Sequence, residues 1–244
     1  MSATETIPTA NDARGAHSLR RFVRGHNQVT LYLGDCLTIP RIEADAVISD
    51  PPYGISLNTD NGTRGGSPPR GGGTKHASID WKKPIIGDDQ PFDPSPWLDY
   101  PIVLLWGANN YADKLPPSRR WLVWDKREGT CVNCNGDVEI AWCSTPGVTR
   151  MFSYLWNGLS MRGEENGKPR IHPTQKPVVL MGWCLEQAKV PVGATVLDPY
   201  MGSGTTGIAC LRTNRNFIGI EKDPEHFKTA CARLERECNQ GALL

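Results

Sequence analysis

The alternation of two kinds of segment along the chain most limits how it can fold. From Gln28 onward, short apolar runs rich in β-branched and aromatic residues alternate with segments of helical pattern. Such runs predict buried strands, and the alternation predicts an α/β domain with a mostly parallel sheet and helices on both faces. We expect strands at 29–33, 45–49, 102–106, 121–125, 138–143, 149–156, 194–198 and 216–221, and helices at 109–114, 177–188, 205–211 and 223–238.

The length and composition predict one soluble domain. The 244 residues can bury a sizeable core, and no apolar run approaches the ~20 residues of a membrane span. The first residues lack the apolar stretch of a secretory signal, so the eight cysteines are expected to be reduced thiols. We predict a flexible tail at 1–27, a single domain at 28–238 and a short tail at 239–244.

One long segment stands apart from the alternating pattern. Residues 54–80 contain six glycines between 62 and 73 and two adjacent prolines, Pro68 and Pro69. This composition cannot build a core element, and a loop of this length inside a compact domain is usually functional or disordered. We expect a mobile loop at 54–80, directly after the most informative tetrapeptide of the chain.

That tetrapeptide is Asp50-Pro51-Pro52-Tyr53, at the carboxyl end of a predicted strand, where open α/β sheets bind ligands. The prolines remove backbone donors and leave the carbonyls of Asp50 and Pro51 as rigid acceptors. Such acceptors could take both hydrogens of a base amino group and localise its nitrogen lone pair, while the Tyr53 ring stacks on the base. A base must leave the duplex to reach such a site. The alternative is a proline-rich turn without function, which the tyrosine, the strand and the following loop disfavour.

A glycine-rich turn forms the second motif. Asp198 ends a predicted strand, and Pro199-Tyr200-Met201-Gly202-Ser203-Gly204 leads into the helix beginning at Thr205. The turn lacks the lysine of a phosphate-binding P-loop, and its match to the dinucleotide fingerprint is weak. We interpret it as a site for the amino-acid part of S-adenosylmethionine, with Asp198 accepting from the amino group. Glu221, at the end of the next strand, suits ribose hydroxyls, unless it is only a solvated strand end.

The third motif is His172-Pro173-Thr174-Gln175-Lys176-Pro177, which precedes a predicted helix. Thr174 lies where the helix would be capped, and Lys176 is a candidate ligand of the cofactor carboxylate. Taken alone, the segment is more typical of a helix start with an exposed lysine.

Together these motifs resemble the β-group DNA amino-methyltransferases, especially the small phage-type modification methylases of restriction-modification systems. The catalytic Asp50 motif comes before the His172 segment and the Asp198 turn, which is the order of that group, and the resemblance covers 28–238. It implies a circularly permuted, seven-stranded, Rossmann-like sheet that uses S-adenosylmethionine, with a catalytic half at 28–160 and a cofactor half at 172–238. It gives Asp35 the role of accepting from the cofactor's adenine, and places the segment from Trp106 to Asn109 beside the target base.

The resemblance also gives a complete set of expected site residues and partners. DNA is the expected partner and a membrane is not; the family allows a homodimer and a cognate restriction nuclease, in the cytoplasm of a bacterium or phage-infected host. The predicted catalytic residues are Asp50, Pro51, Pro52 and Tyr53, and the predicted cofactor residues are Asp35, His172, Thr174, Lys176, Asp198, Tyr200, Gly202, Ser203, Gly204, Thr205 and Glu221.

The nucleic-acid surface is expected to be local, because the net charge is only +1. About thirty residues separate Cys143 from His172, which leaves little room for a target-recognition region. The candidate phosphate contacts are basic residues near the catalytic edge and its loops. They are Arg64, Arg70, Lys75, Arg127, Arg150, Arg162 and Arg170, each of which could equally be a solvated surface charge.

The predicted reaction is direct methyl transfer to an exocyclic amine, most favourably N6 of adenine, because Asp-Pro-Pro-Tyr is typical of adenine enzymes and Ser-Pro-Pro-Tyr of cytosine ones. The alternatives are N4 of cytosine, an RNA base or protein amide, and a non-catalytic DNA-binding or cofactor-sensing module. A lone Cys131-x-x-Cys134 is weak support for zinc, and we expect no metal.

Overall fold

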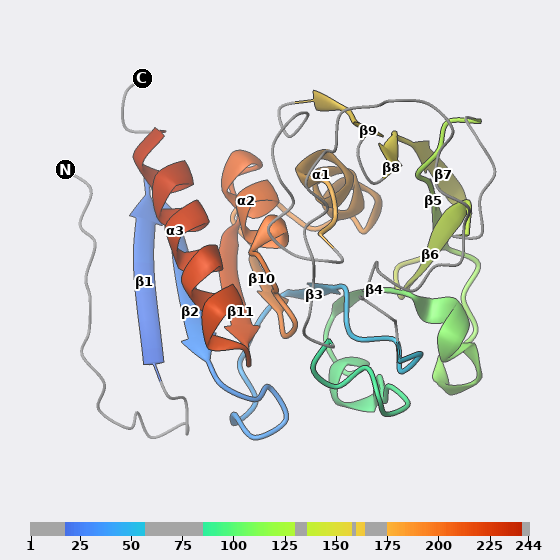
Figure 1. Ribbon diagram of the computed structural model, residues 1–244, viewed down its shortest axis with the longest axis horizontal. Helices are drawn as coiled ribbons and strands as arrows, with labels where there is room; N and C mark the ends of the chain where they lie inside the picture. Colours follow the sequence, from blue (N-terminus) through green and yellow to red (C-terminus); the bar gives the residue numbers. More distant parts are fainter. Residues whose placement is uncertain (1–17, 57–84, 130–135, 158–159, 164–174, 241–244) are drawn as a thin grey trace, which may run out of the picture.

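The computed structural model describes residues 18–56, 85–129, 136–157, 160–163 and 175–240. Nine strands form the main sheet, in the spatial order β1-β2-β11-β10-β3-β4-β6-β5-β7 (Figure 1). They are β1 (Ser18–Arg24), β2 (Asn27–Leu33), β3 (Ala46–Ser49), β4 (Ile102–Trp106), β5 (Trp121–Asp125), β6 (Val138–Cys143), β7 (Arg150–Ser153), β10 (Thr195–Asp198) and β11 (Asn216–Glu221).

The seven inner strands, from β2 to β5 in space, match the predicted number. Five of them, β2, β11, β10, β3 and β4, run parallel to one another, whereas β6 runs antiparallel to both β4 and β5. The strands β1 and β7 form the two edges of the sheet. Since β10 and β11 come last in the chain yet lie in the middle of the sheet, the predicted permuted topology is present.

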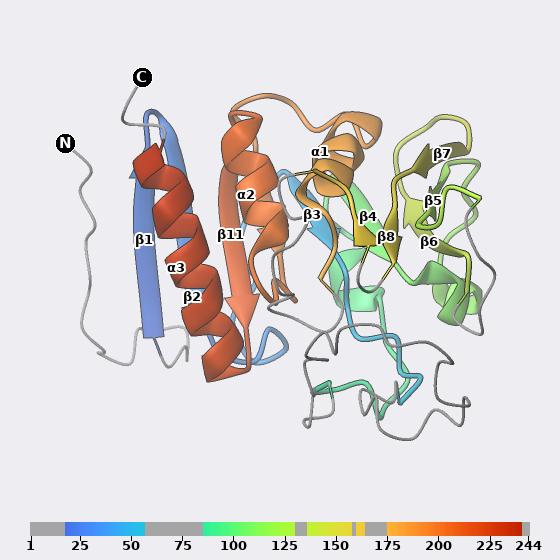
Figure 2. The same cartoon turned by 45° about the horizontal axis from the view of Figure 1, so that its top comes forward.

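The sheet is covered differently on its two faces. The α-helices α1 (Val178–Gln187), α2 (Thr205–Arg212) and α3 (Pro224–Gln240) lie together on one face (Figures 1 and 2). On the other face, the described chain provides loops and the short 3-10 helices η1 (Ser95–Trp97), η2 (Ala108–Asn110) and η3 (Ala112–Lys114). The helix predicted at 109–114 is therefore two 3-10 turns.

Alternation along the central strands explains how one sheet supports two cores. In β3, Ala46 and Ile48 join the cluster beneath the α-helices, whereas Val47 joins the cluster on the opposite face. All four β3 residues are buried, as expected for a strand that is covered on both sides. The catalytic edge of the sheet is thus supported by packed side chains on both faces.

Two predicted boundaries were wrong. The predicted tail at 1–27 includes β1, which pairs with β2 from Ser18 to Arg24. Only Phe22 of this arginine-rich edge strand is fully buried, so its pattern does not predict a strand. At the other end, α3 continues to Gln240, beyond the predicted start of the tail.

The strand predicted at 149–156 is also interrupted. It divides into β7 and the two-residue β8 (Trp156–Asn157), which pairs with β9 (Ser160–Met161) in a separate small sheet. The predicted loop at 54–80 lies outside the described residues from position 57 onward. No helix in the described part of the chain is long and apolar enough to cross a membrane.

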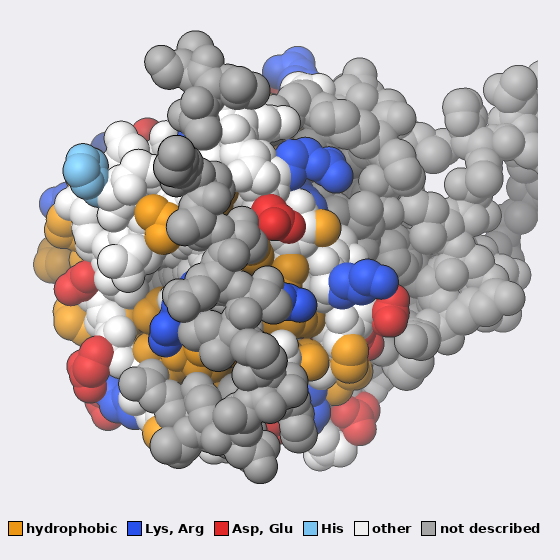
Figure 3. All heavy atoms as spheres, turned by 90° about the vertical axis from the view of Figure 1, so that its left-hand side faces the viewer, with side chains coloured by type: hydrophobic (Ala, Val, Ile, Leu, Met, Phe, Trp, Pro, Cys, Tyr) orange, Lys and Arg blue, Asp and Glu red, His pale blue; other side chains and the backbone are white. Residues whose placement is uncertain are grey.

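Seen from the β1 side, acidic and basic side chains are interspersed with hydrophobic ones (Figure 3). Val23 of β1 is among the exposed hydrophobic residues. Side chains of one charge do not gather on the visible part of this face, in keeping with the almost neutral net charge.

Candidate active site

The site lies where parallel strands end at one edge of the sheet. β3 ends at Ser49, directly before Asp50, and β10 ends at Asp198. β11 ends at Glu221, which is paired with Leu33 of β2, two residues before Asp35. The sequence predicted this convergence, because the carboxyl ends of neighbouring parallel strands meet at the same edge.

Asp50 is held on both carboxylate oxygens. The Tyr53 hydroxyl donates to Oδ1 over 2.6 Å, and the Lys176 ammonium contacts Oδ2 at 2.6 Å. Lys176 also donates to the Tyr53 hydroxyl over 3.2 Å. The Asp50 side chain remains 17 % exposed, so a ligand can still reach it.

Glu139 completes this cluster, and the sequence analysis missed it. Its Oε2 lies 2.9 Å from the Lys176 ammonium, and its Oε1 lies 3.0 Å from the ammonium of Lys126. Glu139 is near the start of β6, and the start of an antiparallel strand meets the edge where parallel strands end. The available signal was a glutamate inside the otherwise apolar run of 138–143.

Burial and charge oppose each other within this cluster. Burial raises the pKa of Asp50, and the nearby Lys176 only partly offsets that effect. Burial would also raise the pKa of Glu139, but Lys176 and Lys126 outweigh it and lower that pKa to about 2. Lys176 loses hydration as well, yet Asp50 and Glu139 raise its pKa to about 12. The lysine is therefore a cation at neutral pH.

The Tyr53 ring rests against the backbone of Gly107. Gly107 follows β4 with a φ of +71°, and a Cβ atom there would overlap the ring carbons of Tyr53. The segment from Trp106 to Asn109, which the family resemblance places beside the target base, therefore forms one wall around Tyr53. Only glycine allows both this backbone conformation and this close approach.

Asp198 is buried and satisfied inside the protein. It is 2 % exposed, and it accepts hydrogen bonds from Ser49 Oγ at 2.6 Å, Thr206 Oγ1 at 2.6 Å and the Tyr200 amide at 3.1 Å. Burial raises its pKa to about 6, against the lowering effect of these hydrogen bonds. In this structure its carboxylate thus fixes the ends of β3 and β10 together.

The glycine-rich turn is built on a left-handed backbone at two positions. Gly202 and Gly204 have φ values of +51° and +79°, and Gly204 precedes the first residue of α2. Ser203 and Thr205 are buried, and the Arg233 guanidinium of α3 donates to the carbonyl and the hydroxyl of Ser203. The turn is therefore held from behind by α3.

Glu221 and Asp35 form the acidic side of the turn. Glu221 accepts from the amides of Gly202 at 2.9 Å and Asp223 at 2.7 Å. Burial raises its pKa to about 7, although these backbone bonds act in the opposite direction. Asp35 lies next to it, accepting from the Leu37 amide at 3.0 Å and pairing with Lys222 at 2.9 Å.

The structure brings most of the predicted cofactor residues together, with one correction. Lys176, predicted to bind the cofactor carboxylate, instead faces Asp50 and Glu139. Its Nζ contacts Asp50, Glu139 and the Tyr53 hydroxyl, and these three contacts use the three N–H donors of the ammonium group. Tyr200 lies edge-on to Phe92 and Trp97 beside the turn. His172 and Thr174 lie outside the described residues.

The structure disfavours two of the predicted phosphate contacts. The Arg127 side chain is only 5 % exposed and is paired with Asp137 at 3.0 Å. Arg150 is exposed but begins β7, where it pairs with Leu122 near the start of β5, so it lies toward the edge opposite Asp50. Arg162 is exposed and paired with Glu128 at 2.8 Å. The predicted contacts Arg64, Arg70, Lys75 and Arg170 lie outside the described residues.

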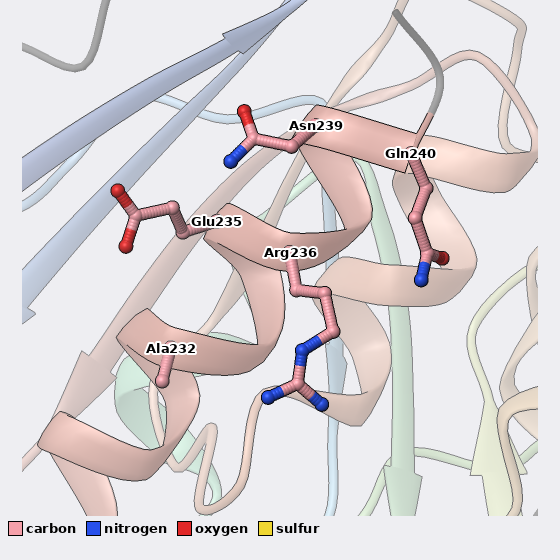
Figure 4. Close-up of a pocket in the computed structure, with 5 residues that line it drawn as sticks. All are labelled: Ala232, Glu235, Arg236, Asn239 and Gln240. Atoms are coloured by element: carbon pink, nitrogen blue, oxygen red, sulfur yellow. The ribbon is translucent and has the colours of Figure 1, made fainter. Parts of the chain in front are cut away.

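Two further features bear on the extent of the site. A hollow of about 350 Å³ is lined, among the residues that the structure describes, by five side chains of α3 (Figure 4). It lies on the C-terminal half of the helix, away from Pro224, which follows the carboxyl end of β11. Within the described residues, no cluster of three or more metal-ligating side chains occurs, and Cys131 and Cys134 lie outside them.

Comparison with known families agrees with this arrangement. Residues 108–232, just over half of the chain, match the family model described as DNA methylase, of the N6 and N4 type. The chain belongs to this DNA methylase family. The resemblance drawn from the motifs is therefore confirmed at the level of the family.

Two known relatives are similar to this chain over only part of their own length. The type II methyltransferase M2.DpnII of Streptococcus pneumoniae is 41 % identical over 83 residues, which are 34 % of this chain and 30 % of the relative. M2.LlaDCHI of Lactococcus lactis subsp. cremoris is 36 % identical over 87 residues, 36 % of this chain and 32 % of the relative. The matched segment thus spans about a third of each relative.

Solved structures extend the likeness over most of the chain. The M1.HpyAVI–SAM complex shares 25 % identity with a TM-score of 0.50, covering 84 % of this chain and all of the other. The cytosine-N4-specific PvuII DNA methyltransferase shares 13 % identity with a TM-score of 0.50, covering 87 % and 92 %. The second likeness shows the fold alone, and together they confirm the predicted Rossmann-like methyltransferase fold.

Proposed function

We propose that this methylase transfers a methyl group from S-adenosylmethionine to the exocyclic amino group of a base in DNA. The observation that carries the proposal is the placement of Asp50 and Asp198 on adjacent strands, joined through Ser49. Asp50 begins the candidate base site, and Asp198 directly precedes the glycine-rich turn. Family membership supports the reaction class.

The chemistry of the turn suits the proposed cofactor. Asp35 and Glu221 present carboxylates at the ends of neighbouring strands, where they can accept from an adenine amino group and from ribose hydroxyls. The positive φ values of Gly202 and Gly204 allow the backbone to approach a ligand closely. The solved relative M1.HpyAVI was crystallised as a complex with SAM.

S-adenosylmethionine supplies a methyl group that its sulfonium already activates, so the protein contributes mainly position and charge. The Asp50 carboxylate and the Pro51 carbonyl accept from the two amino hydrogens and direct the nitrogen lone pair toward the methyl carbon. The nitrogen–carbon bond forms as the carbon–sulfur bond breaks, and the proton leaves to water. Tyr53, held by Asp50 and Gly107, borders the base.

We further propose N6 of adenine as the target atom. The support is the aspartate at position 50, because Asp-Pro-Pro-Tyr is typical of adenine enzymes in the family that the sequence resembles. DNA as partner and a cognate restriction nuclease are part of the same proposal. A homodimer and a cytoplasmic location stay predictions.

Product analysis tests the proposal directly. The purified protein is incubated with S-adenosylmethionine and mixed-sequence duplex DNA, and the digested nucleosides are examined by mass spectrometry. We expect N6-methyladenine, and none with Asp50→Ala. N4-methylcytosine would keep the reaction class and overturn the base. Neither product, with cofactor binding intact, would direct the search to RNA, to protein amides or to a non-catalytic role.

A binding experiment separates the roles of the two aspartates. We expect Asp50→Ala to abolish turnover while the affinity for S-adenosylmethionine, measured by calorimetry, is preserved. Asp198→Ala should weaken that affinity, because it loosens the turn. Equal losses of affinity in both variants would contradict this division of roles.

A further inference from the structure

We propose that Lys176 and Glu139 are positioning residues for the proposed methyl transfer: Lys176 holds the Asp50 carboxylate in place and in its charged form, and Glu139 holds Lys176. The inference rests on the proposed function, but the ionic cluster itself can be measured without any turnover. The residues involved are a contiguous chain of side chains, Lys126, Glu139, Lys176, Asp50 and Tyr53, which we call the Asp50 network.

Alternating charges run through the Asp50 network. From Lys126 to Glu139 the separation is 3.0 Å, from Glu139 to Lys176 it is 2.9 Å, and from Lys176 to Asp50 it is 2.6 Å. Two cations and two anions therefore balance. The four charged side chains are between 7 % and 24 % exposed, a setting in which unpaired charges are costly.

The donors of Lys176 are matched by acceptors within the network. An ammonium group has three N–H donors. Three acceptors lie within reach: Asp50 Oδ2 at 2.6 Å, Glu139 Oε2 at 2.9 Å and the Tyr53 hydroxyl at 3.2 Å. This arrangement assigns Lys176 to the orientation of Asp50 and Tyr53 together, and leaves no donor for a cofactor carboxylate.

The charge of Asp50 determines whether it can serve as an acceptor. An ionised carboxylate only accepts hydrogen bonds, whereas a protonated one carries a donor where the base amino group would bind. Burial favours the protonated form, and an opposite charge within hydrogen-bond distance favours the ionised one, by about 1–3 pKa units. Removing Lys176 would leave Asp50 beside Glu139 with no cation between them.

Other ionisable groups also face Asp50 from the surrounding elements. All of them are neutral or negative, whereas Lys176 is the cation in direct contact with Asp50. They are Tyr53, Glu139 of β6, Tyr111 between η2 and η3, Cys184 of α1 and Asp198 of β10.

The test compares pH profiles of kcat for the full chain on duplex DNA with S-adenosylmethionine. For Lys176→Met we expect the acid limb of the profile to move up by about 1–3 pH units, with a lowered kcat at neutral pH that recovers at alkaline pH. Lys176→Arg should restore most of the wild-type profile. Lys228→Met, which changes an exposed lysine of α3, is the matched control.

Glu139→Gln should behave differently. Glu139 raises the pKa of Asp50 through repulsion, so its neutralisation moves the acid limb down or leaves it in place. We expect kcat to fall all the same, because Lys176 loses one of its two anionic partners, and Glu139→Asp should recover part of it. General damage to the fold would not move the acid limb up in Lys176→Met while moving it down, or leaving it in place, in Glu139→Gln.

An activity-independent measurement separates this inference from the proposed function. In protein with carboxyl-¹³C-labelled aspartate, the Asp50 resonance is identified by its loss in Asp50→Asn, and its titration is followed by NMR. A higher titration midpoint in Lys176→Met supports the network even if no methylated product forms. An unchanged midpoint with an unchanged profile, or a Lys176→Met variant whose main defect is a weakened affinity for S-adenosylmethionine, would overturn it.

Discussion

Ser49 donates a 2.6 Å hydrogen bond from its hydroxyl to the Asp198 carboxylate, and so connects the last residues of two adjacent parallel strands. Asp50 follows Ser49 directly, and the glycine-rich turn follows Asp198. The candidate base site and the candidate cofactor site are therefore one hydrogen bond apart. The Coulombic interaction between Asp50 and Asp198 also raises the pKa of Asp198.

Ser49→Ala tests this connection. The variant leaves a buried carboxylate with two hydrogen-bond donors in place of three, and we expect the free energy of unfolding to fall by about 1–3 kcal/mol. Urea denaturation measures the change. The control is Ser153→Ala, which removes a 3.3 Å bond to Asp125 at an exposed position and should change stability by less than about 0.5 kcal/mol. Equal effects in the two variants would contradict the assignment.

Gly107→Ala tests the packing of Tyr53. Gly107 and Gly129 have nearly the same φ, +71° and +72°, so alanine strains the backbone similarly at both, by about 1–2 kcal/mol. Only at Gly107 would the new Cβ meet the Tyr53 ring, whereas no atom of the described residues lies within 4 Å of a Cβ at Gly129. We expect Gly107→Ala to reduce kcat on DNA at least tenfold beyond Gly129→Ala (about 1.4 kcal/mol). Similar kcat values would show that the position of the ring is unimportant.

Asp88→Ala tests the support behind the Asp-Pro-Pro-Tyr segment. Asp88 Oδ1 accepts from the amides of Gly54 at 2.9 Å and Ile55 at 3.3 Å, directly after Tyr53. Loss of this anchor should lower kcat while the affinity for S-adenosylmethionine stays the same. Asp93→Ala removes a comparable carboxylate, which accepts from Ser95 at the start of η1, and should leave kcat unchanged. A loss of cofactor affinity in Asp88→Ala would argue for wider disruption.

Stability should depend on pH through Glu221 and Asp198. Burial raises the pKa of Glu221 from 4.5 to about 7 and that of Asp198 from 3.8 to about 6. Across this window the folded protein binds more protons than the unfolded chain, so the free energy of unfolding falls as pH rises. Glu139 acts at lower pH, because its lowered pKa of about 2 contributes stability that is lost only as the pH falls from 4.5 through 2.

Urea midpoints at about pH 5 and about pH 8 measure this dependence. Glu221→Gln should flatten the slope, because it removes the group that titrates highest in the window. A wild-type protein whose stability rises steadily across the window would contradict the raised pKa values. If Glu221 also accepts from ribose hydroxyls as proposed, the affinity for S-adenosylmethionine should decrease below pH 7 in the wild type but not in Glu221→Gln.

The strands and the edge of the site could be predicted because local pattern determines them. The boundaries of β4, β5 and β6 agree with the apolar runs, and Asp50, Asp198 and Glu221 meet because they end or directly follow neighbouring parallel strands. By contrast, β1 is an edge strand with one fully buried residue. Its stability comes from pairing with β2, which no local pattern records.

The partners within the site could not be predicted, because they depend on strand direction. Glu139 reaches the catalytic edge only because β6 runs against β4, a reversal that the residues of β6 do not encode. The sequence analysis assigned Lys176 to the cofactor because the sequence does not show that Asp50 and Glu139 both lie beside this lysine. Arg127 was expected at the surface, but its pairing with Asp137 allows burial.

The reversal of β6 also has a consequence for protein engineering. Asp-Pro-Pro-Tyr is a contiguous motif of four residues, but its partners are distant in the sequence. Glu139 is 86 positions from Tyr53, and Lys176 is 126 positions from Asp50. A graft of the tetrapeptide onto an all-parallel scaffold would lack the strand start that carries the glutamate, and the aspartate would arrive without its counter-ion. Transplanting this chemistry therefore means transplanting the antiparallel strand β6 and the segment before α1 as well as the loop.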